Sequence, residues 1–178
     1  MDKTITIVIY KSSTGFTKWY AERIAAALSC PAVPLQEASV ELLSGCDTVI
    51  FGSRAYTGYI DSFDKAKALV KRSGNPRLVL FVTGATPNAA EDIVNRFWAN
   101  TLTAEELSSL PHFYMQGGLN YEKMSLSDKL MMKAAAAMMK RKKNKTPEDL
   151  LFQEAIAQSF DHKSLEYIEP LLAYLREH

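Results

Sequence analysis

The chain has 178 residues, which suits one domain, and its apolar fraction of 47% and charged fraction of 23% are sufficient for a buried core. Its net charge of +1 favours neither nucleic acid nor any other strongly charged partner, and Cys30 and Cys46 lack the spacing of a metal site. The N-terminal apolar run is too short for a signal peptide, and no uncharged apolar stretch approaches the roughly 18 residues of a spanning helix, so we expect a cytoplasmic protein.

Short β-branched apolar runs alternate along the chain with segments of helical spacing. Strands are predicted over residues 4–10, 47–52, 77–83 and 112–116, with a short edge-like segment at 32–35. Helices are predicted over 16–29, 61–72, 88–100 and 164–176, the last with Leu165, Ile168, Leu171, Leu172 and Leu175 facing inward. Alternating strands and helices predict an α/β fold, in which a parallel sheet carries helices on both faces.

Ligands of such sheets bind beyond the carboxyl ends of the strands. Three loops are expected there, at 11–16, 53–60 and 83–88. The first continues into a predicted helix and carries hydroxyl side chains and a glycine: Ser12, Ser13, Thr14, Gly15, Phe16 and Thr17. Unpaired N–H groups at a helix start bind phosphate, so this loop is either a phosphate site or an ordinary capped turn.

The other two loops suit a flat ligand. The second contains two tyrosines, Tyr56 and Tyr59, together with glycines at a strand end, which favours stacking on an aromatic ring with close backbone approach. The alternative is that both tyrosines are half-buried surface residues. The third loop, 82–88, has small residues that leave space and expose backbone polar groups, or it simply forms a turn before the next helix.

Together the three loops resemble those of the flavodoxin-like proteins, which bind FMN and have five parallel strands in the order 2-1-3-4-5. Ser12, Thr14, Gly15 and Thr17 match the family's phosphate motif, with Ser13 and Phe16 at its free positions. The resemblance implies that Tyr56 stacks on the flavin ring. It also implies that the flanking loop residues contact the ring or its edges: Ala55, Thr57, Gly58, Thr83, Gly84, Ala85 and Thr86. It implies no catalytic side chain and no metal.

An insertion at 119–160 interrupts the predicted single domain, 1–178, before the closing helix. A helix is expected over 126–141 with Ser127 as its cap, and its broad apolar face comprises Leu130, Met131, Ala134, Ala135, Met138 and Met139. Residues 120–145 hold eight basic and two acidic side chains, a charge of +6 that leaves −5 on the remainder. Such a helix either packs on the domain or docks, over 124–145, on an anionic membrane surface or an acidic partner.

The insertion and the second loop resemble, in layout, the branch that contains the quinone-dependent protoporphyrinogen oxidases. Two functions therefore remain open: a flavodoxin-type electron carrier that exchanges electrons with a redox partner protein, and an FMN-dependent oxidase that passes electrons to a quinone at the inner face of a membrane. A third alternative is a module that has lost its flavin and only binds a partner. No nucleic-acid motif is present, and the oligomeric state is left open.

Overall fold

The computed structural model describes residues 4–178. The first three residues belong to the predicted domain and to the stretch that argued against a signal peptide, and they lie outside the described residues. The strands are β1 (Thr6–Tyr10), β2 (Ala32–Pro34), β3 (Thr48–Tyr56), β4 (Tyr59–Ile60), β5 (Arg77–Gly84), β6 (His112–Gln116), β7 (Gly118–Leu119) and β8 (Phe160–Asp161). The helices are α1 (Phe16–Leu28), α2 (Val40–Leu43), α3 (Phe63–Arg72), α4 (Glu91–Thr101), α5 (Ala104–Ser109), α6 (Leu126–Arg141), α7 (Pro147–Ala155) and α8 (Glu169–Glu177), with 3₁₀ turns at Leu35–Glu37 and Leu165–Ile168.

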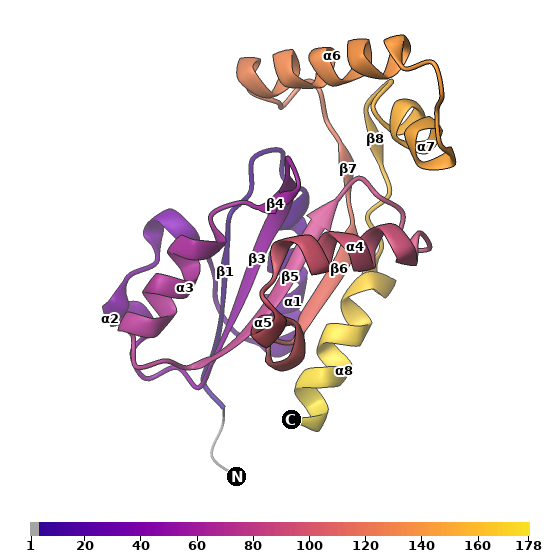
Figure 1. Ribbon diagram of the computed structural model, residues 1–178. Coiled ribbons are helices and arrows are strands. Elements are labelled where there is room, and N and C mark those ends of the chain that lie inside the picture. Colours follow the sequence, from indigo (N-terminus) through magenta and orange to yellow (C-terminus); the bar gives the residue numbers. More distant parts are fainter. Residues whose placement is uncertain (1–3) are drawn as a thin grey trace.

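The main sheet has five parallel strands in the spatial order β2-β1-β3-β5-β6. This is the predicted order 2-1-3-4-5 once the short β4, which pairs only with β3, is set aside. Helices cover both faces, as Figure 1 shows, and the fold is therefore the expected flavodoxin-like α/β architecture. The carboxyl ends of β1, β3 and β5 meet along one edge of the sheet.

Successive side chains of a strand point to opposite sides of the sheet. Because helices cover both sides, the strands are buried on both faces. Ile7 and Ile9 pack with α3 and α4 on one side, whereas Val8 packs with α1 and α8 on the other. At 0% exposure, Tyr20 of α1 donates a hydrogen bond to the Gln116 carbonyl (2.5 Å) and accepts one from the Ser164 N–H (3.1 Å). Burial raises the pKa of Tyr20 to about 12, so this hydroxyl stays protonated.

The second predicted loop is instead the tip of a β-hairpin. Strand β3 runs to Tyr56, beyond the expected end at residue 52, and turns through Thr57 and Gly58 into β4. Both turn residues have positive φ, +48° and +82°, which is the turn geometry that matches the twist of a two-residue hairpin. The alternation of larger side chains after Gly52 was the signal for this extension.

Several helix ends also differ from the prediction. Helix α4 begins at Glu91 rather than 88, and the closing helix begins as a 3₁₀ turn because Pro170 lies at the start of α8. Leu165, expected inward, is 55% exposed in that turn, while Ile168 and Leu171 are buried as expected. The short helices α2 and α5 and the insertion helix α7 were not predicted.

The insertion projects from a two-stranded antiparallel stem formed by β7 and β8. Helix α6 spans the predicted residues, but its cap is Ser125 rather than Ser127, because the Ser125 Oγ accepts the N–H of Asp128. In Figure 1, α6 and α7 lie beyond the carboxyl edge of the main sheet. Within residues 4–178, none of the helices is both long and apolar enough to cross a membrane.

Candidate functional site

The three sequence-predicted segments line one cavity of about 670 Å³ at the carboxyl edge of the sheet. Thirteen of the fourteen predicted binding residues border it: Ser12, Ser13, Thr14, Phe16, Thr17, Ala55, Tyr56, Thr57, Gly58, Thr83, Gly84, Ala85 and Thr86. Gly15 does not border the cavity. It supplies the turn into α1 at φ +97°, a conformation that favours glycine.

The first loop presents the N-terminal end of α1 to the cavity. The Gly15 N–H donates to the Ser12 Oγ (3.2 Å), which closes the turn, and no side chain caps the helix. The first-turn N–H groups of α1 therefore lack a side-chain acceptor, as an anion-binding helix start requires. The Ser13 and Thr14 side chains border the same space.

Two residues that were predicted to contact the flavin form a hydrogen bond with each other. Thr17 and Thr83, 2% and 3% exposed, share a hydrogen bond of 2.8 Å between their hydroxyls. The Thr83 hydroxyl also lies within 3.4 Å of the Ser53 carbonyl. This pair ties the first loop to the third, because it joins the start of α1 to the end of β5.

The third loop is held from below by Tyr114 of β6. Its hydroxyl donates to the Thr86 carbonyl (3.0 Å), and burial raises its pKa, so the donor stays protonated. Gly84 lies directly against this side chain, because a Cβ added there would be 2.4 Å from the Tyr114 hydroxyl oxygen. Glycine at 84 therefore makes room for a tyrosine of the core rather than for a ligand.

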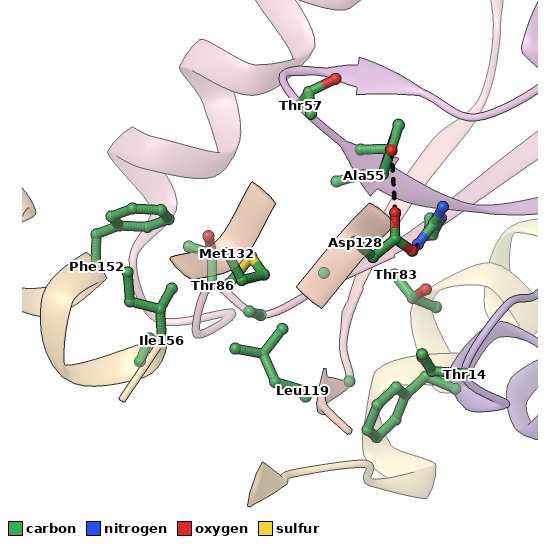
Figure 2. Close-up of a pocket in the computed structure, with 18 of the residues that line it drawn as sticks. Thr14, Ala55, Thr57, Thr83, Thr86, Leu119, Asp128, Met132, Phe152 and Ile156 are labelled. Atoms are coloured by element: carbon green, nitrogen blue, oxygen red, sulfur yellow. Dashed lines mark hydrogen bonds and ion pairs between the residues drawn. The ribbon is translucent and has the colours of Figure 1, made fainter. Parts of the chain in front are cut away.

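The insertion supplies a second wall of the cavity that the sequence reasoning missed. Its apolar contributors are Met124, Met131, Met132, Ala135, Leu151, Phe152, Ala155 and Ile156. Figure 2 shows Met132, Phe152 and Ile156 grouped with Leu119 at one end of the cavity, away from Thr14 and Thr83. The Met/Ala face of α6 was the available signal, but it predicted packing on the domain or a membrane, not a cavity wall.

A polar network joins this wall to the second segment. Asp128 of α6, which is 7% exposed, accepts hydrogen bonds from Arg54 Nη1 and from the Tyr56 hydroxyl, both at 3.1 Å. Arg54 also pairs with Asp61 (3.2 Å), and its guanidinium lies 4.2 Å from the centre of the Tyr56 ring. Burial opposes ionisation of Asp128, but the hydrogen bonds from Arg54 and Tyr56 outweigh it and lower its pKa.

The same network affects Tyr56, the residue expected to stack on a flavin. Its hydrogen bond to Asp128, with burial as a lesser cause, raises the pKa of Tyr56. The hydroxyl therefore remains a donor. Tyr59, at 70% exposure, is the surface residue of the pair and does not border the cavity.

These residues fit a flavin nucleotide. The uncapped start of α1 beside Ser13 and Thr14 suits a terminal phosphate. The Tyr56 ring and the loop of small residues at 84–86 border the space where a flat ring would lie.

Comparison with known protein families gives a match. The model of the flavodoxin domain family matches residues 7–146. No curated protein matches the chain. Among solved structures, the chain is similar to a flavodoxin from the domain Archaea, with 11% identity, coverage of 86% of this chain and 99% of that one, and a TM-score of 0.41. It is also similar to flavodoxin 1 from Bacillus cereus, with 16% identity, 72% and 94% coverage, and a TM-score of 0.41.

A WrbA-like flavodoxin from Agrobacterium tumefaciens has 17% identity, coverage of 85% of this chain and 94% of that one, and a TM-score of 0.41. The assignment itself depends on the family match, which covers most of the chain, and on the strand order of the sheet. Flavodoxin-like domains bind a flavin, usually FMN. The chain belongs to the flavodoxin domain family.

Proposed function

We propose that this protein binds FMN and transfers electrons through it. The observation that carries the proposal is the convergence of the three predicted segments, from the ends of β1, β3 and β5, on one cavity. A bound flavin supplies reversible one- and two-electron chemistry, so the protein has to bind, orient and shield it.

The chain's own groups divide this work. The first-turn N–H groups of α1 and the hydroxyls of Ser13 and Thr14 hold the phosphate by hydrogen bonds to its oxygens. Tyr56 orients the ring by stacking, and the backbone of 84–86 contacts the ring edge. The insertion excludes water from the part of the cavity that α6 and α7 border, because the side chains that they place there are apolar.

The test is an absorbance spectrum of the purified protein, followed by FMN titration of the apoprotein. We expect saturable binding, and Thr14→Glu should abolish it because a carboxylate at the phosphate loop repels the phosphate. Thr14 is a better choice than Thr17, whose hydroxyl bonds to Thr83 inside the core. Thr4→Glu is the matched control, since Thr4 is exposed and precedes β1 at the opposite edge of the sheet. A wild-type protein without saturable FMN binding would refute the proposal.

The apolar wall favours a second candidate function, the oxidase that passes electrons to a quinone. The support for this proposal is that Met131, Met132 and Phe152 of the insertion border the same cavity, and such an apolar lining is typical of sites for small apolar molecules. We propose Ala135→Trp as the test, because Ala135 borders the cavity from α6. The variant should retain FMN but lose rapid reoxidation by a water-soluble quinone. Ala137→Trp, on the exposed side of α6, is the control, and equal rates in all three proteins would contradict the oxidase function.

The outer face of α6 supports the proposal of peripheral membrane contact. Leu126 and Leu130 are 85% and 70% exposed, and Lys129 and Lys133 are their neighbours at helical spacing. Lys142 alone among the eight cations of 120–145 forms an ion pair, with Asp149 (2.5 Å), in the part of the chain that the structure describes. Apolar and basic groups together bind anionic lipid surfaces.

Vesicle co-sedimentation tests this contact. Vesicles with anionic lipid should bind the protein in a salt-sensitive way, and neutral vesicles should bind it less. Replacing Leu126 and Leu130 by Ser should remove the binding without touching the cavity, because neither side chain borders it. Negligible binding of the wild-type protein to anionic vesicles would remove the membrane proposal and leave FMN binding unaffected.

A further inference from the structure

The insertion and the predicted flavin-stacking residue share one buried carboxylate. Each oxygen of Asp128 has its own donor, Oδ1 the Tyr56 hydroxyl and Oδ2 the Arg54 guanidinium. Asp128 is also the only buried acidic residue within 4–178. A buried charge without partners is costly, so docking of the start of α6 requires both β3 side chains to be in place.

Backbone geometry makes this arrangement specific. Arg54 and Tyr56 are two residues apart on β3, so their side chains leave the strand on the same side. Asp128 is the third residue of α6, and its N–H is bound by the capping Ser125. The carboxylate therefore has a fixed origin at the start of the helix, and the strand presents two donors to it.

The network also limits how Tyr56 can meet a flat ligand. The Arg54 guanidinium covers one face of the ring, 4.2 Å from its centre. Only the opposite face is left for stacking. The bond from the hydroxyl to Asp128 then limits rotation of the ring, so the insertion determines the plane in which Tyr56 is presented.

We propose that Asp128 is a positioning residue for the flavin, which couples closure of the α6–α7 insertion to cofactor binding. This inference rests on the proposed function. When Asp128 holds Tyr56 and Arg54, the ring is oriented before the flavin arrives, which lowers the ordering cost of binding. Thermodynamic linkage requires the reciprocal effect, so a bound flavin holds α6 in its docked position.

The test uses the full chain and the variants Asp128→Asn and Tyr56→Phe. FMN affinity is measured by quenching of flavin fluorescence, and docking of α6 by amide hydrogen exchange with and without FMN. We expect Asp128→Asn to weaken FMN binding about tenfold, within the usual range of coupling between sites. Tyr56→Phe should weaken FMN binding in the same direction. The double variant should be no weaker than Asp128→Asn alone, because the asparagine amide has a donor in place of one acceptor oxygen and cannot reproduce the network that orients Tyr56.

Hydrogen exchange separates positioning from general stability. FMN should slow exchange in α6 of the wild-type protein and have little effect there in Asp128→Asn. Asp92→Asn, an exposed position on α4, is the matched control and should behave as wild type. If Asp128→Asn is poorly folded, Tyr56→Phe, which retains the Arg54–Asp128 pair, decides the question by the same two measurements.

Two negative outcomes have different meanings. A wild-type protein that binds no FMN overturns the proposed function and this inference with it. If the wild type binds FMN but Asp128→Asn and Tyr56→Phe bind it equally well, with the same FMN-dependent protection of α6, only the positioning role is overturned.

Discussion

Replacement of Gly84 by alanine tests how the core shapes the loop at the ring edge. The added Cβ would lie 2.4 Å from the Tyr114 hydroxyl oxygen and 3.1 Å from Cε2 and Cζ of the ring. A shift of a few tenths of an ångström would relieve the contacts with the ring carbons, but the hydroxyl oxygen would have to move further. It would then lose its hydrogen bond to the Thr86 carbonyl (3.0 Å).

The expected cost combines two effects. Overpacking of a core costs about 1–3 kcal/mol, and loss of a buried hydrogen bond costs about 1 kcal/mol more. We therefore expect Gly84→Ala to reduce the free energy of unfolding by about 2–4 kcal/mol, as measured by urea denaturation of the apoprotein. FMN affinity should fall as well, because the loop at 84–86 loses its support from Tyr114.

A double-mutant cycle identifies the cause. Tyr114→Phe removes the oxygen that the new methyl group would meet, so Gly84→Ala should cost about 1–2 kcal/mol less in the Tyr114→Phe background than in the wild type. Gly84 has no positive φ, so backbone strain contributes nothing to the effect. An equal cost in both backgrounds, or a cost below about 0.5 kcal/mol in the wild type, would refute the steric reasoning.

Two further predictions concern Tyr20 and Asp128. Tyr20→Phe should lower the free energy of unfolding by about 1–3 kcal/mol, because it leaves the Gln116 carbonyl and the Ser164 N–H without this partner. Tyr59→Phe, at a 70% exposed position, should change it little in the same urea titration, and equal effects would contradict this explanation. The pKa of Asp128 is lowered from 3.8, so its contribution to stability is present above pH 3.8 and is lost as the pH falls through the depressed value. Asp128→Asn should therefore flatten the pH dependence of the urea midpoint below pH 4, and an unchanged slope would contradict a lowered pKa of Asp128 in the folded protein.

Most of the fold was predictable because strand and helix patterns are local. The short apolar runs at β1, β3, β5 and β6 identified the parallel sheet, and all four strands lie where they were expected, although β3 is longer. The hairpin at 56–59 was missed because positive φ at Thr57, a residue that seldom adopts it, is imposed by the pairing of β3 with β4. Local sequence carries little information about such pairing.

The candidate site was predictable only in part for the same reason. The motif from Ser12 to Thr17 indicated a phosphate loop, since helix-start chemistry depends on neighbouring residues. That the hydroxyls of Thr17 and Thr83 bind each other could not be predicted, because 66 positions separate them in the chain. Asp128 was counted only as one acid in a basic segment, although burial makes it the carboxylate that joins α6 to β3.

The sequence by itself determined the α/β class and the three segments at the carboxyl edge of the sheet, because these follow from periodicity and from short motifs. The order of the strands was expected only from the resemblance to the flavodoxin-like proteins. Only the tertiary structure decided that the α6–α7 insertion covers the cavity that these segments form. The long-range pairing of Asp128 with Arg54 and Tyr56 places the Met-rich face of α6 over the cavity. Such pairing depends on which charged side chains are brought together when the whole chain folds, so a local sequence pattern does not predict it.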